Sequence, residues 1–211
     1  PPRHDPRDSL VCREPGVSSI GELPPGARVG TSSLRRVTQL RFLRPDVTVV
    51  PLRGNVPTRV RKVQSGKDYD AALLALAGLA RLGLEESATP VDAMDVMPAP
   101  GQGALGLEIR AADRETRERL APLADRASTT HVLAERALLA ALGGGCQAPV
   151  AAYVETGETG HGKRLYGRVM ALDGSAQLTA SAEIDDEQPE RAGEAVARLL
   201  ESAGAASLLA R

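Results

Sequence analysis

VGTSSLRRVTQLRFLRPDVTVVPLRGNVPTR, residues 29–59, contains two similar turns, each leading from a strand into a helix. In the first, the apolar strand end at Val29 precedes Gly-Thr-Ser-Ser and a helix that opens with Arg35 and Arg36. In the second, a buried strand over 47–52 precedes the turn 53–55 and a helix over 57–64. Ser, Thr and Asn accept hydrogen bonds from free N–H groups at a helix start. Because helix N-termini and arginines both favour anions, the two turns together predict a site for a polyanion.

The charge of this region supports a local anion site. Between Arg28 and Gly66, eight arginines and one lysine accompany a single acid, Asp46, although the net charge of the chain is −1. Such a cluster is also typical of a solvated helix face or a nucleic-acid patch. Here the arginines follow strand ends, where open α/β sheets bind ligands. With one Phe, three Tyr and no Trp, the chain offers no stacking platform for single-stranded nucleic acid, so we expect no nucleic-acid partner.

Composition indicates a globular protein of one or two domains. The 211 residues are 42% hydrophobic and 25% charged. No apolar run reaches membrane-spanning length and the first residues show no signal-peptide pattern, so we expect a cytoplasmic protein that does not bind membranes. We also expect a monomer. Two cysteines make no disulfide framework, and the three histidines have no ligand spacing, so we expect no structural metal.

Strands and helices alternate through the first half of the chain. Leu10 and Val11 are expected to form a short strand. The apolar run over 69–76 is typical of a central parallel strand, and a short helix is expected over 77–82. Strand-helix alternation over about sixty residues predicts a doubly wound α/β domain similar to those of periplasmic binding proteins.

A second, smaller α+β domain with an antiparallel sheet is expected after the linker at Pro98 and Pro100. Alternating apolar residues over 104–109 predict a strand, and Asp113 is expected to cap a helix ending near residue 124. A helix over 129–142 and strands over 150–154, 165–172 and 176–184 follow. The last helix, over 189–210, is expected to be amphipathic. Four of its residues should face the core: Ala195, Val196, Leu199 and Leu200.

Cys146 has an unusual setting. A lone cysteine is usually a small buried hydrophobe, which is how we interpret Cys12. Three glycines precede Cys146, and Gln147 and Pro149 follow it, so its thiol could be presented to a bulky attached group.

Five motifs, in order over nearly the whole chain, resemble the porphobilinogen deaminase (hydroxymethylbilane synthase) family: GTSSLRR at 30–36, LRGNVPTR at 52–59, YDAALLALAGLARLG at 69–83, PAPGQGALGLEIR at 98–110 and AERALLAALGGGCQAPV at 134–150. The resemblance implies a transferase that joins four porphobilinogen molecules head to tail into hydroxymethylbilane, with loss of ammonia, on the route to haem and other tetrapyrroles. It also implies a dipyrromethane cofactor bound covalently through Cys146.

The resemblance further implies which residues bind cofactor and substrate. Porphobilinogen carries acetate and propionate groups, so a growing pyrrole chain accumulates carboxylates that guanidinium groups and helix N-termini can hold. The implied residues are Thr31, Ser33, Arg35, Arg36, Arg53, Gly54, Asn55 and Arg59, with Arg81 and Gln102 at the edge of the same cleft.

One part of the family pattern is absent. The family's N-terminal domain holds an H-S-x-K-D motif whose aspartate steers protonation of the pyrrole nitrogens, and this chain lacks it. DPRDSLV at 5–11 resembles the family's crossover between its first two domains. We therefore expect three parts: 1–103 as an anion- and substrate-binding domain, with the crossover 1–11; 104–125 as a segment that returns to the absent domain; and 126–211 as the domain with the cofactor cysteine. No catalytic residue is expected in the chain, which should be inactive alone.

Two other functions fit parts of the sequence. A non-catalytic module that binds small anions would use the same arginines and a similar α/β topology, but the Gly-Gly-Gly-Cys loop argues against it. A nucleic-acid-binding protein is disfavoured by the near-neutral charge and the scarcity of aromatic residues.

Overall fold

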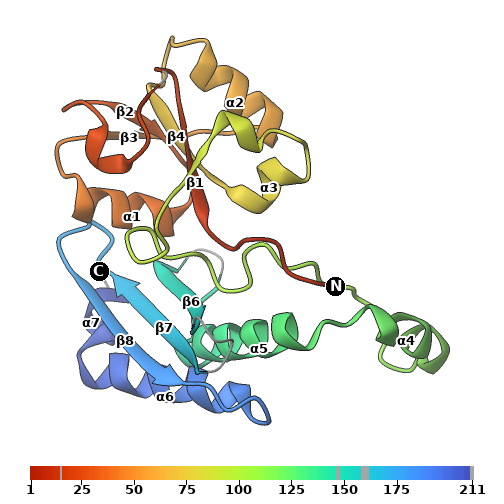
Figure 1. Cartoon of the computed structure of the whole chain (residues 1–211). Helices are drawn as coiled ribbons and strands as arrows, with labels where there is room; N and C mark the ends of the chain where they lie inside the picture. The colour runs from red at the N-terminus through yellow and green to blue at the C-terminus, as the bar shows by residue number, and fades with distance from the viewer. Residues whose placement is uncertain (15, 146–147, 158–161, 210–211) are drawn as a thin grey trace.

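The computed structural model of the chain describes residues 1–14, 16–145, 148–157 and 162–209. An α/β domain is built around a five-stranded sheet, and a C-terminal α+β domain around a three-stranded antiparallel sheet (Figure 1). This is the fold class expected from the sequence. Within the described residues, no helix combines the length and apolar character needed to cross a membrane.

The five-stranded sheet mixes parallel and antiparallel strands. Its strands are Asp8–Cys12 (β1), Arg28–Gly30 (β2), Thr48–Val50 (β3), Ala71–Ala75 (β4) and Thr89–Pro90 (β5), in the order β3-β2-β4-β1-β5. β3, β2 and β4 are parallel neighbours, whereas β1 runs antiparallel to β4 and β5. The carboxyl ends of β2, β3 and β4 therefore lie at one edge of the sheet, and β1 begins at that same edge.

Helices cover both faces of this sheet. They are Leu34–Leu43 (α1), Val56–Gln64 (α2) and Leu76–Ala80 (α3), with short 3₁₀ helices at Ile20–Glu22 and Glu85–Ser87. Leu40 of α1 belongs to the core on one face, and Val60 of α2 to the core on the other. Successive strand side chains point to opposite faces, so β4 places Leu73 in the first core and Leu74 in the second. The expected doubly wound arrangement is therefore present.

Two strands differ from expectation in their place in the sheet. The strand expected to be buried over 47–52 pairs only over 48–50, where it is half-buried to exposed. Its sole neighbour among the described strands is β2, so one of its edges is not covered. The short strand expected at Leu10 and Val11 is buried except at Cys12, which is half-buried, and lies between β4 and β5.

The C-terminal domain packs helices against one face of its sheet. Val150–Thr156 (β6), Lys163–Met170 (β7) and Gln177–Glu183 (β8) pair in sequence order, and the helices are Arg126–Ala141 (α5), Pro189–Ser202 (α6) and Ala205–Leu209 (α7). The single helix expected over 189–210 is interrupted at Gly204, whose φ of +98° favours glycine. Val196 and Leu200 face the core as expected and Ala195 is half-buried, whereas Leu199 is exposed, contrary to expectation.

Residues 104–124, here called the connecting arm, extend from the body of the molecule (Figure 1). All of them are described, and the strand expected over 104–109 is not formed. Leu105 and Leu107 are 52% and 53% exposed. The arm's helix, Arg114–Leu120 (α4), begins as expected at Asp113, whose carboxylate accepts from the Thr116 amide at 3.0 Å. A 3₁₀ helix at Ala121–Leu123 follows.

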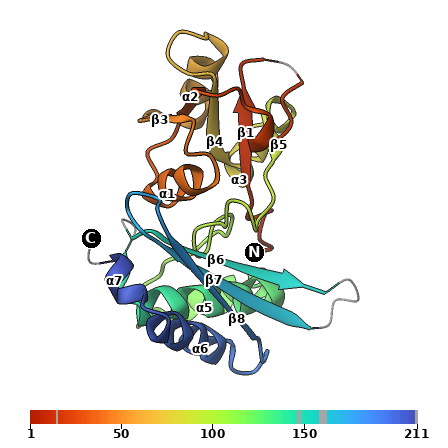
Figure 2. The ribbon, with the colours of Figure 1, turned by 90° about the vertical axis from the view of Figure 1, so that its left-hand side faces the viewer.

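The C-terminal domain touches α1 directly. The turn between β7 and β8 reaches this helix (Figure 2). Arg41 Nη1 donates to the Leu172 carbonyl at 3.2 Å, and a Cβ added at Gly174 would collide with the Arg41 side chain. The helix that opens with Arg35 and Arg36 is therefore held from both domains.

Candidate carboxylate-binding site

The two strand-to-helix turns lie side by side, as predicted. β2 and β3 are parallel neighbours, with Gly30 opposite Val50. Just beyond them, the Ser32 hydroxyl donates to the Leu52 carbonyl at 3.0 Å and accepts from the Leu52 amide at 3.1 Å. This one side chain therefore joins the two turns at the carboxyl edge of the sheet.

The second turn presents cations to solvent. Asn55 caps α2 by accepting from the Thr58 amide at 3.0 Å, and Gly54, at φ +124°, accepts from Arg59 Nε at 2.7 Å through its carbonyl. The Arg53 side chain is exposed, and its guanidinium has no protein partner within the described residues. Arg53 and the terminal nitrogens of Arg59 can therefore donate to a bound carboxylate.

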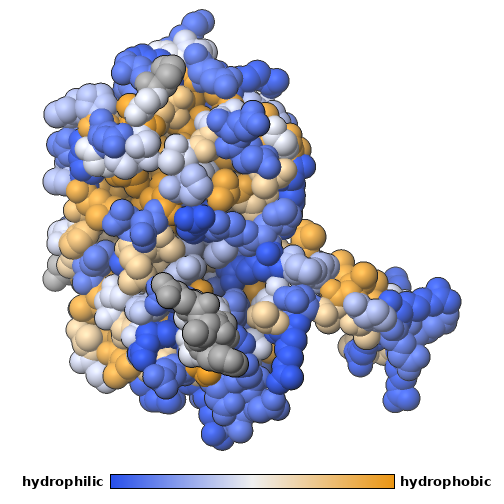
Figure 3. Space-filling model, in the orientation of Figure 1, coloured by the Kyte–Doolittle hydropathy of each residue, from blue (hydrophilic) through white to orange (hydrophobic). Residues whose placement is uncertain are grey.

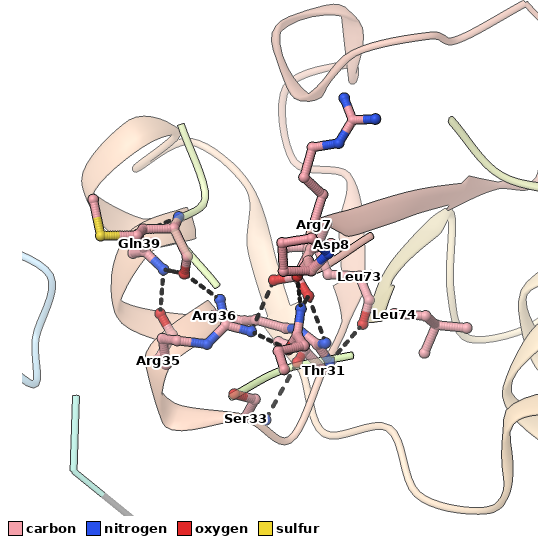
Figure 4. Close-up of polar contacts among 12 residues, drawn as sticks. Arg7, Asp8, Thr31, Ser33, Arg35, Arg36, Gln39, Leu73 and Leu74 are labelled. Atoms are coloured by element: carbon pink, nitrogen blue, oxygen red, sulfur yellow. Dashed lines mark hydrogen bonds and ion pairs between the residues drawn. The ribbon is translucent and has the colours of Figure 1, made fainter. Parts of the chain in front are cut away.

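The arginines after the first turn point inward. Figure 4 shows the guanidinium groups of Arg35 and Arg36 directed at Asp8 on β1. Asp8 Oδ2 lies 2.8 Å from Arg35 Nη2, and Asp8 Oδ1 lies 2.7 Å from Arg36 Nη2. Arg35 Nη1 also donates to the Met97 carbonyl at 2.6 Å, and Arg36 Nη1 to the Leu73 carbonyl at 3.2 Å.

Burial makes this cluster a fixed set of charges. The side chains are 0% exposed at Asp8, 4% at Arg35 and 9% at Arg36. Burial alone would raise the pKa of Asp8, but the charges of the two arginines outweigh it and hold that pKa below its usual range. Burial lowers the pKa of Arg35, which the charge of Asp8 opposes. Two guanidinium groups against one carboxylate leave an excess positive charge beneath the first turn.

The other expected site residues surround this cluster. Gln102 Nε2 donates to Asp8 Oδ1 at 2.8 Å, and its Oε1 accepts from Arg35 at 3.3 Å. Arg81 Nη2 donates to the Gly103 carbonyl at 2.8 Å. Thr31 is buried, and its hydroxyl accepts from the amide of Ser33, the N-cap residue of α1, at 3.2 Å. Cys146 lies outside the described residues, so its expected role stays a prediction.

Sequence reasoning missed Asp8. The arginine-rich stretch itself contains a single acid, Asp46, and this residue pairs with Arg44 at 2.7 Å. Asp8 comes from a strand twenty residues before that stretch, and its antiparallel pairing with Ala75 places it at the carboxyl edge. A carboxylate directly before a buried apolar run was the available signal, because buried acids are normally paired.

The surface of this face matches the site in character. Hydrophilic side chains line the hollow between the two domains in Figure 3, whereas apolar side chains are exposed where the connecting arm leaves the body. A polar hollow suits a carboxylate-rich ligand.

The fold and the candidate site define the chain as an α/β protein with clustered arginines at the carboxyl edge of a mixed sheet. A family model described as "Porphobilinogen deaminase, dipyromethane cofactor binding domain" matches residues 1–118, and one described as "Porphobilinogen deaminase, C-terminal domain" matches residues 129–202. The chain belongs to the porphobilinogen deaminase family, an enzyme family of tetrapyrrole biosynthesis with a dipyrromethane cofactor, as the resemblance implied.

Individual relatives agree with the family models. The porphobilinogen deaminase of Corynebacterium glutamicum is 49% identical over 211 residues, which cover 99% of this chain and 69% of the relative. That of Roseiflexus castenholzii is 51% identical over 212 residues, covering 100% of this chain and 68% of the relative. That of Sorangium cellulosum is 57% identical over 154 residues, 72% of this chain and 50% of the relative.

Proposed function

We propose that this chain supplies the cofactor- and substrate-binding parts of a transferase that joins four porphobilinogen molecules into hydroxymethylbilane and releases ammonia. The observation that carries the proposal is the pair of adjacent turns, joined by Ser32, with exposed cations on one and a buried arginine pair under the other. A ligand that gains carboxylates as it grows needs several cations held on rigid elements.

The site residues fall into two tiers in this proposal. Exposed donors bind the carboxylates directly, and the buried pair acts from beneath by its charge and by fixing the start of α1. The first tier is Arg53, Arg59 and Arg81 with the turn residues Ser33, Gly54 and Asn55; the second is Thr31, Arg35, Arg36 and Gln102.

The dipyrromethane cofactor fits this donor set, since a group that bears several carboxylates matches guanidinium groups with unused N–H donors. When bound, it supplies the primer on which the product grows. We propose Cys146 as its point of attachment, supported by the Gly-Gly-Gly-Cys loop and by the family's cofactor. The proposed domains are 1–103, 104–125 and 126–211. The separate C-terminal family match and the separate apolar cores support the last boundary, whereas the first family match continues across residue 103 to residue 118.

We further propose that the 211-residue chain alone does not turn over porphobilinogen. Expelling ammonia and managing a pyrrole proton requires an acid or base that can exchange a proton. Asp8 is the acid that the described structure brings to the arginines, and its carboxylate already receives Arg35, Arg36 and Gln102. With its pKa held low, Asp8 is a fixed anion at neutral pH and a poor proton carrier.

Turnover and binding test this proposal on the purified chain. Porphobilinogen should bind without release of hydroxymethylbilane, and Arg53→Ala should weaken that binding by about tenfold, the typical effect of losing one charge-assisted hydrogen bond. Arg13→Ala, a change of the same type distant from the turns, is the control. Steady release of hydroxymethylbilane would show that the proton-carrying group lies within these residues. Absence of any binding would reject the proposed site.

Cofactor attachment is tested by intact mass. The intact protein, purified from cells that make porphobilinogen, should carry an adduct of two pyrrole units, which Cys146→Ser abolishes and Cys12→Ser retains. An adduct that depends on Cys12 would refute the assignment. The cytoplasmic location, the monomeric state of the enzyme and the absence of nucleic-acid or membrane partners stay predictions.

A further inference from the structure

Arg168 is a buried cation outside the site described above. It lies on β7, on the sheet face turned toward α1, and is 5% exposed. Its Nη1 donates to Gln39 Oε1 at 3.0 Å and to the Asp95 carbonyl at 3.2 Å, and its Nη2 donates to the Met94 carbonyl at 2.8 Å. One guanidinium from the C-terminal domain therefore binds both α1 and the chain segment before Met97.

Among the described residues, Arg168 has no carboxylate within salt-bridge distance, and its side-chain partners are an amide oxygen, a hydroxyl and backbone carbonyls. Burial lowers the pKa of Arg168, which the negative charge of Asp95 opposes. Burying an unpaired cation is costly, and an apolar side chain would fill the same space at lower cost if packing were the sole requirement. The fork geometry of a guanidinium, which can span three acceptors at once, is what an apolar residue lacks.

Gln39 connects Arg168 to the arginine cluster. Its Oε1 also accepts from the Met97 amide at 2.8 Å, and its Nε2 donates to the Met97 carbonyl at 3.0 Å. The Gln39 amide therefore binds both the N–H and the C=O of Met97, the two groups that a neighbouring β-strand would bind. That same Met97 carbonyl accepts from Arg35 Nη1 at 2.6 Å. An unbroken chain of short polar contacts runs from Arg168 through Gln39 and Met97 to Arg35.

We propose that Arg168 is a positioning residue: through Gln39 and the Met97 carbonyl it sets the direction of the Arg35 guanidinium, so the C-terminal domain tunes the carboxylate site. The inference rests on the proposed function for its consequence in binding. The geometry itself does not depend on that function. Without Arg168, the Met94 and Asp95 carbonyls lose a hydrogen-bond donor. Gln39 Oε1 loses one of its two donors and keeps the Met97 amide.

Arg164 provides a matched control. It lies four residues earlier on β7, on the same sheet face, and bonds Ser181 and Glu183 instead of α1. Arg164→Met and Arg168→Met remove the same charge and side-chain shape from the same strand. In the full chain, Arg168→Met should weaken binding of a synthetic dipyrromethane tetracarboxylate by roughly three- to thirtyfold, the range typical of changes along a coupled network. Arg164→Met should leave binding unchanged, and Arg168→Lys should restore part of the loss.

A readout of geometry accompanies the binding measurement. The side-chain Nε–Hε resonance of Arg35, assigned from its loss in Arg35→Lys, should move in Arg168→Met and stay in place in Arg164→Met. Arg168→Met should also change binding less in an Arg35→Ala background than in the wild type, because both changes act on one contact chain. If Arg168→Met does not fold, the same comparisons are made with Arg168→Lys against Arg164→Lys.

Two outcomes would overturn the inference. One is an Arg35 resonance that stays in place in Arg168→Met; the other is ligand affinity equal to that of Arg164→Met while Arg53→Ala weakens binding. A wild-type chain that does not bind the dipyrromethane would instead reject the proposed function, and the Arg35 resonance would still decide the positioning role.

Discussion

At the scale of single residues, Asp8 holds the candidate site together. Replacing Asp8 with Asn keeps the shape but leaves Arg35 and Arg36 buried without a counter-charge, and loss of one partner from a buried ion pair typically costs about 3–5 kcal/mol. We expect Asp8→Asn to lower the free energy of unfolding by that amount in urea titrations at pH 7. Asp46→Asn, which removes a solvent-exposed carboxylate paired with Arg44, should change it little.

The effect of Asp8 should depend on pH in a defined direction. The folded-state pKa of Asp8 lies below its unfolded value of about 3.9, so the unfolded chain binds its proton first. The stability that Asp8 contributes is therefore complete above pH of about 4 and is lost as pH falls through the lower folded-state pKa. The difference in stability between wild type and Asp8→Asn should shrink from pH 5 toward pH 2. A difference that stays constant over this range would mean that the carboxylate charge is not its source.

Residue-level expectations succeeded where the signal was local. Asn55 and Asp113 cap their helices through contacts three residues away, and such contacts can be read from spacing. The inward direction of Arg35 and Arg36 could not be read in this way. It depends on Asp8, 28 residues before Arg36, and on a strand orientation that no short pattern specifies.

At the scale of elements, the connecting arm exposes several apolar side chains close together in the sequence. Leu105 and Leu107 are half-exposed and have no strand partner within the described residues, and contiguous apolar surface of this kind promotes self-association. We expect the purified chain to bind a hydrophobic dye and to elute as more than one species in size-exclusion chromatography. The double substitution Leu105→Glu with Leu107→Glu should reduce both effects.

Leu82→Glu is the control for the arm, since Leu82 is 52% exposed at a separate surface position. It should leave dye binding unchanged. A monodisperse wild-type chain with a strongly protected Leu107 amide in hydrogen exchange would show that the arm has found a partner in solution.

The sequence predicted which segments form helices or strands, but not which other elements each one packs against or pairs with. Apolar periodicity located every strand of the C-terminal sheet to within a few residues, because each pairs with the next along the chain. The strand expected over 104–109 has the right alternation but lacks a partner, and alternation alone does not form a strand. The exposure of Leu199 has a similar origin: its apolar character fits the helix pattern, but α5 and the sheet cover the face that holds Val196 and Leu200.

At the scale of the whole molecule, the contact between the two domains could not be predicted from the sequence. Arg168 and Gln39 are 129 residues apart, and nothing in the pattern around either one indicates the other. Gly174 lies against α1 for a similar long-range reason, although the Asp-Gly pair that it forms with Asp173 is a local hairpin signal. The expectation that the first domain binds anions rests on local turns, whereas the contact of that domain with the second depends on side chains that meet only after folding.

The antiparallel position of β1 between β4 and β5 has a consequence for how the chain is made. During translation β1 leaves the ribosome well before β4, its partner 65 residues later at the Ser9–Leu74 contact. At about 5–20 residues per second, this strand waits roughly 3–13 s with its apolar side chains unpaired. Asp8 is carried on β1, so its contacts with Arg35 and Arg36 form in their folded arrangement only after β4 has been made. The charge balance of the candidate site is therefore completed late in synthesis, when the sheet closes.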